Sequence, residues 1–164
     1  MVDTSDILIL LGAVVIFAIL SLNTNRMLNN HNSAILESEL TYTGIAKAQD
    51  VIDHARVLAF DETTIGGAEP AVVPDGFTDP ADLGSVSDGD SASVYDDFDD
   101  FNGMSETDTT AEAIYAVSAE VMYVTSGDPD TDAGTQTKYK KLTVTVSSPY
   151  LDNSITMSFI KGYY

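Results

Sequence analysis

The stretch Ile7–Leu22, which reads ILILLGAVVIFAILSL, decides how this chain is organised. It contains no charged residue. A lone transmembrane helix needs about 17–25 apolar residues to cross roughly 30 Å of hydrocarbon, so this stretch is short for that purpose. No basic residue precedes it and no small-x-small cleavage site follows it cleanly, which favours an anchor or filament-core helix over a signal peptide. The side chains that we expect to face lipid or neighbouring helices are Ile7, Leu10, Leu11, Val14, Val15, Phe17, Ile19 and Leu20.

The helix is predicted to continue well beyond the apolar stretch. Residues 13–43 contain neither Gly nor Pro, and the first proline is Pro70. An apolar pattern with helical spacing then follows, and it consists of Ile45, Ala48, Ile52, Ala55 and Ala59. We therefore expect one helix over Ile7–Phe60, apolar all round at first and later packed by one stripe on a globular domain. The Asn-rich residues 23–32 are either a solvated exit from the apolar zone or a segment that melts on assembly.

Three segments alternate between apolar and polar residues and are predicted to be half-buried strands. They are Tyr115–Thr125, Tyr139–Ser147 and Ser154–Ile160. Turn residues at 148–153 predict that the last two form an antiparallel hairpin. The fold class is therefore α+β, with a long N-terminal helix packed on a small antiparallel sheet with acidic loops. We divide the chain into an anchor helix, 1–60, and an acidic loop region with a β domain, 61–164.

The charge balance excludes several classes of function. The formal net charge is −19, and residues 61–108 hold fourteen acidic residues with no Lys or Arg. Such a surface repels phosphate backbones, so we expect no specific nucleic-acid binding. The chain has no cysteine, which excludes disulfides, thiolate metal sites and thiol catalysis. A nucleophile elbow, a P-loop and a dinucleotide fingerprint are all absent from the sequence, and we do not expect an enzyme or a bound cofactor.

Two acidic segments are candidate cation sites. Asp128, Asp130 and Asp132 alternate in a turn, which is the spacing that opens many calcium loops. An acidic loop that connects two strands is the competing interpretation, because the Gly and Glu of an EF-hand are not in register. Residues 96–100 hold four Asp, for which a solvated loop competes with a cation site. His31 and His54 have no second metal ligand at a suitable spacing, so we expect both on the helix surface.

The order of these elements resembles the layout of type IV pilins and pseudopilins. The resemblance lies in the apolar helix at the start, its amphipathic continuation, the strand pair at 139–146 and 154–159, and the acidic run 95–103. It implies a subunit that polymerises with copies of itself into an extracellular filament at the cell surface. A precursor pool in the inner membrane and a pilus assembly machinery would then be its partners. The alternatives are a minor pilin, a secretion-system pseudopilin, or a membrane-anchored surface binding domain that does not polymerise.

The first residues depart from the pattern of type IV pilins. Pilins usually carry Glu at mature position five, where its carboxylate pairs with the terminal amine of a neighbour, and this chain has Ser5. Asp3 or Asp6 could take that role, because an unpaired charge near hydrocarbon is costly. The alternative is that both acids lie in the polar interface and cap the start of the helix. The short basic leader of pilins is also absent, as expected if Met1 is the processed N-terminus.

Overall fold

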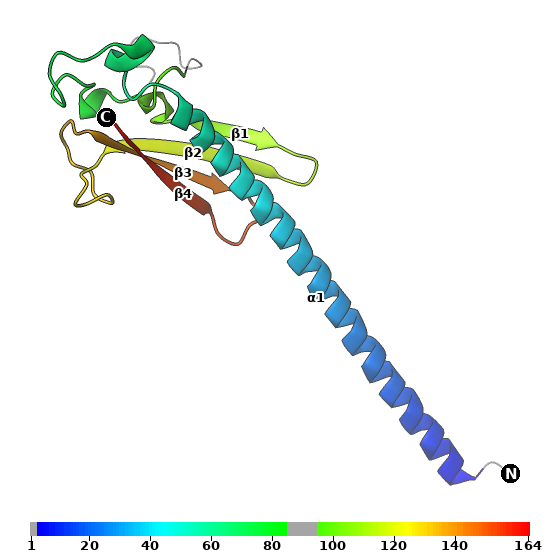
Figure 1. Cartoon of the computed structure of the whole chain (residues 1–164). Helices are drawn as coiled ribbons and strands as arrows, with labels where there is room; N and C mark the ends of the chain where they lie inside the picture. The colour runs from blue at the N-terminus through cyan, green and yellow to red at the C-terminus, as the bar shows by residue number, and fades with distance from the viewer. Residues whose placement is uncertain (1–2, 85–94) are drawn as a thin grey trace. The chain divides into compact units, whose positions relative to one another are not determined.

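The protein has an α+β fold, as predicted. The computed structural model describes residues 3–84 and 95–164. Its helix α1 spans Thr4–Val57, and its strands are β1 (Ser105–Thr109), β2 (Ile114–Tyr123), β3 (Tyr139–Ser147) and β4 (Ile155–Gly162) (Figure 1). Three short 3-10 helices, η1 (Glu62–Gly67), η2 (Pro80–Asp82) and η3 (Asp99–Phe101), lie in the connection between α1 and β1. Asp88, Gly89 and Asp90, which are predicted from their residue types to form a turn, lie outside the described residues.

The chain forms two compact units, Met1–Glu39 and Leu40–Tyr164. The boundary falls inside α1, whereas the sequence-based division lay at residue 60. It moves toward the N-terminus because the last turns of α1 bury side chains against the sheet and therefore belong to the domain. Helix α1 also ends at Val57, three residues before the predicted end at Phe60.

The sheet has four strands in the order β1-β2-β3-β4, and every neighbouring pair is antiparallel. The predicted hairpin of the last two strands is confirmed, with Leu142 opposite Phe159. The sheet has a fourth strand besides the three predicted from alternation, because β1 pairs with β2 over Ser105–Thr109. The five residues of β1 are polar and all exposed, so they lack the apolar alternation that marked the other strands.

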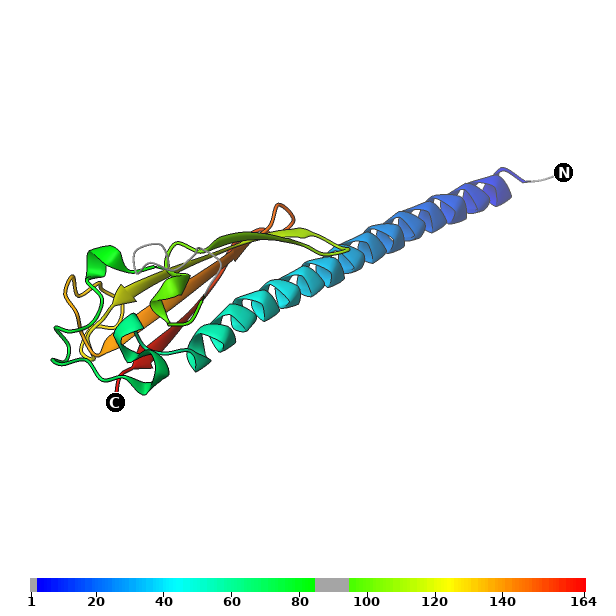
Figure 2. The same cartoon turned by 90° about the horizontal axis from the view of Figure 1, so that it is seen from above.

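Unit Leu40–Tyr164 has its core between the last turns of α1 and one face of the sheet (Figure 2). From the helix, Gly44, Ala48, Ile52 and Ala55 are buried. The sheet contributes the apolar sides of β2 and β3, where Tyr115, Val117, Ala119, Val121, Leu142, Val144 and Val146 are buried. Buried residues alternate with more exposed ones along both strands, as predicted. Ile45, which the helical pattern placed on the buried stripe, is exposed, and its neighbour Gly44 takes the buried position.

Small residues let α1 approach the sheet closely. A Cβ added to Gly44 would lie 2.5 Å from Cδ1 of Ile155, which is closer than two carbon atoms can stand. Glycine in a helix interior costs about 1 kcal/mol relative to alanine, so the close contact between helix and sheet is the reason for its presence. Gly12 has no atom within 4 Å of such a Cβ and serves as a comparison position.

We predict that Gly44→Ala destabilises the domain when residue 155 is Ile and stabilises it when residue 155 is Val. In the natural background the added methyl group meets Ile155, and overpacking of this kind costs about 1–3 kcal/mol, more than the helix propensity that alanine returns. In an Ile155→Val background the interfering Cδ1 is gone, so Gly44→Ala should stabilise the domain. Thermal unfolding of the full chain in detergent measures both effects, and Gly12→Ala, whose added methyl group meets no atom, should show only the small gain in helix propensity. An equal effect of Gly44→Ala in both backgrounds would contradict the packing described.

Candidate functional site

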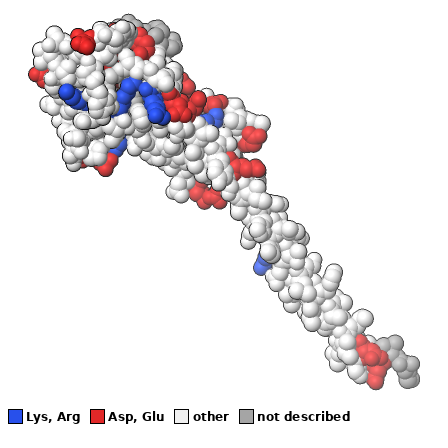
Figure 3. Space-filling view, in the orientation of Figure 1, with Lys and Arg blue, Asp and Glu red and all other residues white. Residues whose placement is uncertain are grey.

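The apolar part of α1 is exposed on all sides in the isolated chain. The eight side chains predicted to face lipid or neighbouring helices are between 50% and 74% exposed. By length and composition α1 is able to cross a membrane, and its start is compatible with membrane insertion or with a signal sequence. Figure 3 shows this helix surface almost free of charge, and Arg26 is the one Lys, Arg, Asp or Glu within residues 7–36. An apolar surface of this extent requires lipid or other helices around it.

Large apolar side chains continue beyond Leu22. Met27 and Leu28, and then Ile35 and Leu36, are between 55% and 63% exposed. The two pairs are eight residues apart, which is close to two helical turns, so they share one side of the helix. Polar residues between them remain helical in this structure, including the Asn-rich stretch 23–32. The hypothesis that this stretch melts on assembly stays a prediction.

The two acids at the start of α1 lie in exposed positions. The Asp3 side chain accepts a hydrogen bond from the backbone N–H of Thr4 at 2.9 Å, and its carbonyl accepts from the N–H of Asp6 at 3.0 Å. Asp3 therefore acts at the helix start, where a negative charge is favoured. Met1 lies outside the described residues, so pairing of Asp3 or Asp6 with a terminal amine stays a prediction.

A charged cluster that the sequence analysis missed lies inside the domain. Lys140 on β3 is completely buried, and so are Asp61, which follows α1, and Asp99, at the start of η3. The Lys140 ammonium donates to Asp61 Oδ2 at 2.7 Å, to the carbonyl of Phe60 at 3.0 Å, and to Asp99 Oδ1. The sequence does contain an indication of this cluster. Lys140 stands at an alternating position of β3 whose other members, Leu142, Val144 and Val146, are buried. A lysine at that position must find a buried partner.

The acidic run around η3 is buried, so the interpretation of residues 96–100 as a solvated loop was wrong. Asp97, Asp99 and Asp100 are at most 2% exposed. The reason lies in the residues between them, because Phe98 and Phe101 insert into the core and carry the neighbouring carboxyl groups inside. Asp97 Oδ1 accepts from the N–H groups of Asp99 and Asp100, at 2.8 and 3.2 Å, which fixes the first turn of η3.

The protonation behaviour of the cluster follows from burial and from Lys140. Burial and the charge of Asp99 raise the pKa of Asp97 to about 8. Burial also raises the pKa of Asp99, although Lys140 opposes it. For Asp61 burial acts in the same direction, but the charge of Lys140 and hydrogen bonds from Lys140, Thr78 and Thr63 outweigh it and hold its pKa below the usual value. Asp61 is therefore ionised at neutral pH, whereas Asp97 holds its proton.

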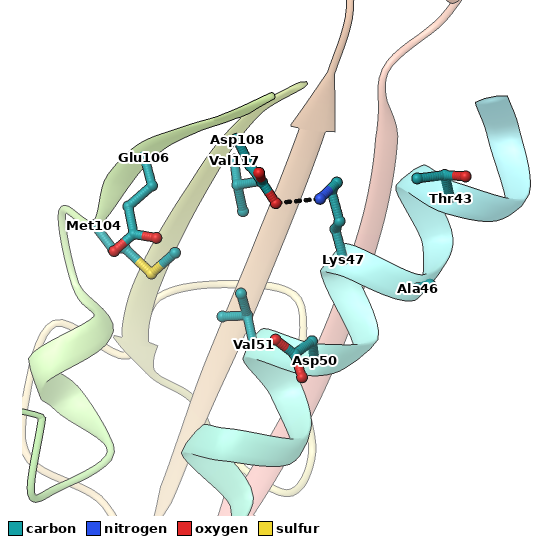
Figure 4. Close-up of a pocket in the computed structure, with 9 residues that line it drawn as sticks. All are labelled: Thr43, Ala46, Lys47, Asp50, Val51, Met104, Glu106, Asp108 and Val117. Carbon is teal, nitrogen blue, oxygen red and sulfur yellow. Dashed lines mark hydrogen bonds and ion pairs between the residues drawn. The ribbon is translucent and has the colours of Figure 1, made fainter. Parts of the chain in front are cut away.

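An open groove of about 380 Å³ lies between α1 and the strands β1 and β2 (Figure 4). Lys47 and Asp108 form an ion pair across it. Its lining combines apolar with acidic side chains and consists of Thr43, Ala46, Lys47, Asp50, Val51, Met104, Glu106, Asp108 and Val117. The ion pair already neutralises part of the charge there, and the groove by itself indicates no particular ligand.

The candidate calcium loop holds its carboxylates in other interactions. Asp128 Oδ1 and Asp132 Oδ1 accept backbone N–H groups of Asp130 and Gly134, at 3.3 and 2.9 Å. Asp130 pairs with Lys141 at 2.6 Å. Within residues 3–84 and 95–164 no three His, Asp or Glu side chains are arranged to hold a metal ion. Calcium binding by this loop stays a prediction.

Comparisons of the chain with protein-family models, with curated proteins and with solved structures found no match. The argument for a function therefore depends on the features described above.

We predict that Asp61→Asn lowers the free energy of unfolding by about 1–3 kcal/mol at pH 7, because the Lys140 ammonium keeps Asp99 as a partner but loses its charge-assisted hydrogen bond to Asp61, and because the bonds that Asp61 accepts from Thr63 and Thr78 weaken. The pKa of Asp61 is lowered by folding, so its stabilisation is present at neutral pH and is lost as the pH falls below about 4. The variant should thus lose less stability than the natural chain between pH 4 and pH 2. Urea unfolding of the full chain in detergent, followed by circular dichroism, measures both effects.

The matched control is Asp79→Asn. Asp79 also caps a short helix, since its Oδ1 accepts the N–H of Ala81 at 3.0 Å, but it is exposed. Asparagine caps a helix about as well as aspartate, so this change should be close to neutral. Equal losses in the two variants would show that Lys140 does not depend on Asp61.

Proposed function

We propose that this chain is a structural subunit that polymerises through its N-terminal helix into a type IV pilus-like filament at the cell surface. The observation that carries the proposal is the apolar stretch of α1, which is exposed around its whole circumference. Burial of one large apolar side chain contributes about 1.5–3 kcal/mol, so eight half-exposed ones represent on the order of 10 kcal/mol. A soluble monomer does not leave apolar surface of this extent exposed to water.

A filament fits this helix better than a membrane alone. The charge-free apolar run is short for a lone spanning helix, yet exposed apolar pairs continue at Met27–Leu28 and Ile35–Leu36. At about 1.5 Å per residue, a hydrocarbon layer of about 30 Å that begins at Ile7 ends near Met27, so Ile35–Leu36 lie beyond it, whereas neighbouring helices in a bundle extend that far. Apolar residues recurring every seven or eight positions are typical of helix–helix contacts.

The domain suits a repeated subunit on an outer surface. The chain carries a formal charge of −19, and most of the acids that the structure describes in unit Leu40–Tyr164 are exposed. Like charges on neighbouring domains oppose close contact between them, which leaves cohesion to the helices. Transfer of each helix from bilayer to bundle exchanges one apolar surrounding for another, so many repeated head-to-tail contacts must supply the stability of the filament.

We predict that Val15→Asp abolishes filaments. A charge in the centre of the bundle or of the bilayer costs about 2.5–3.5 kcal/mol or more, and the cost recurs in every subunit. The measurement is electron microscopy of filaments sheared from producing cells, with mass spectrometry of their main component. Val72→Asp is the control, because Val72 is an exposed valine of the domain and the same change there should leave filaments unaffected. Normal filament abundance in Val15→Asp would refute the proposal.

A membrane-anchored domain that does not polymerise is the second candidate, and the residues beyond the apolar run discriminate between the two. We predict that Ile35→Asp reduces filament abundance about tenfold or more, corresponding to at least 1.4 kcal/mol lost per contact, while the protein stays in the membrane fraction. Asn32→Asp adds the same charge at an exposed polar position of the same helix and should be tolerated. Recovery of the natural chain in membranes alone, with no filaments, would favour the anchored domain.

A further inference from the structure

The buried cluster brings an amine and a carboxyl group together from distant parts of the chain. Lys140 lies 41 residues from Asp99 and 79 residues from Asp61, yet its Nζ contacts both carboxylates. All three side chains are fully buried. The rings of Phe60 and Tyr123 lie 4.8 and 5.2 Å from Nζ, and they complete an apolar surrounding for the amine. The reactants of an amide bond are thus already in contact and shielded from water.

The cluster is not balanced as a set of ions. Three fully buried carboxyl groups, of Asp61, Asp97 and Asp99, surround one fully buried ammonium. Oδ2 of Asp97 and Oδ2 of Asp99 are both buried and accept no hydrogen bond. Buried ions cost several kcal/mol each unless they are fully paired, so this arrangement keeps an excess of negative charge at a high cost. Conversion of one ammonium–carboxylate pair into a neutral amide removes two buried ions, one of each sign. The net charge of the cluster does not change, and Asp61 keeps the hydrogen bonds that it accepts from the N–H groups of Thr63 and Thr78.

We propose that Lys140 and Asp99 form an intramolecular isopeptide bond between Nζ and Cγ, with release of one water molecule. The net reaction joins R–NH3⁺ and R′–COO⁻ to give R–NH–CO–R′ and H2O, so atoms and charge balance without an oxidant or a co-reactant. Lysine is the nucleophile and the aspartate carboxyl carbon is the electrophile. Because the fold holds the amine and the carboxyl group together, the reaction is effectively unimolecular, and the effective concentration of one group at the other is high.

Two neighbouring carboxyl groups supply the proton transfers. Asp61 Oδ2, 2.7 Å from Nζ, accepts one ammonium proton and leaves a neutral amine. Asp97, whose Oδ1 accepts the backbone N–H of Asp99 at 2.8 Å, gives its proton to the Asp99 carboxyl group, which makes that group an electrophile. The amine then attacks Cγ, and the departing oxygen leaves as water with the second nitrogen proton. The proton on Asp61 finally replaces the one that Asp97 lost, so both acids return to their first state.

The pKa directions agree with these assignments. Asp97, whose pKa burial and Asp99 raise to about 8, holds a proton at neutral pH. Asp61, whose pKa lies below its usual value, is ionised and free to accept one. The single hydroxyl proton of Tyr123 is shared between the carbonyl of Thr78, at 2.9 Å, and Asp61 Oδ2, at 3.3 Å, and the N–H of Thr78 donates to the same Oδ2 at 2.9 Å, which holds the accepting carboxylate in place. General acid–base groups placed in this way accelerate such steps by about 10²–10⁴-fold.

The test is mass spectrometry of the purified full chain. A trypsin digest should contain residues 57–138 joined to residues 139–141, at the sum of their masses less one water, since Lys140 no longer serves as a cleavage site. Fragmentation of this product should place the link on Asp99. Separate, unlinked peptides from the natural chain would overturn the proposal, and so would a link to Asp61.

Four variants test the proposal further. Asp99→Asn should still form the link but release ammonia, so its product has the same mass as that of the natural chain while its precursor is lighter by the mass difference between Asp and Asn. Lys140→Arg keeps a buried cation and should give no link. Asp97→Asn should slow linkage about 100-fold, and Asp152→Asn, an exposed acid remote from the cluster, should not change it. Equal linkage rates in the last two variants would overturn the role of Asp97.

Discussion

The close packing of the last turns of α1 on the sheet is the contact on which the domain depends. Without this helix the inner faces of β2 and β3 would present a row of Val, Leu and Tyr side chains to water. The helix comes near enough only because Gly44, Ala48 and Ala55 are small. One element thus serves two purposes. Its later turns complete a hydrophobic core, and its first turns offer an apolar surface that the chain itself does not cover.

Much of this arrangement could be predicted from the sequence. The period of two in β2 and β3, and the absence of helix breakers before Gly44, identified the helix, two core strands and the hairpin with β4. These patterns are strong because the buried faces are formed by uniformly apolar residues. Strand β1 could not be recognised from apolar alternation, because its residues, SETDT, are all polar and exposed and it pairs with β2 through the backbone. Ile45 was assigned to the buried stripe on hydrophobicity, whereas steric fit placed the smaller Gly44 there.

The buried charges could not be located from the sequence in the same way. Residues 96–100 look like a solvated acidic loop, because Asp is normally exposed. Only the fold shows that Phe98 and Phe101 anchor the segment and that Lys140, from a strand far along the chain, meets it. The one indication of this long-range pairing in the local sequence is a lysine, Lys140, at a position of β3 where the alternation predicts a buried apolar residue. The acids of the candidate calcium loop are the opposite case, because their regular spacing is visible in the sequence while their side chains are used in local turns.

The polar strand β1 has a consequence for how many copies of this domain can be crowded together. It forms one edge of the sheet, and an edge strand offers unpaired backbone groups to any similar strand nearby. Glu106 stands on that edge, beside Asp108 and its partner Lys47, so a second copy approaching in register would place the two Glu106 carboxylates close together. The domain therefore resists joining edge to edge into continuous β ribbons, which protects it from aggregation at high local concentration.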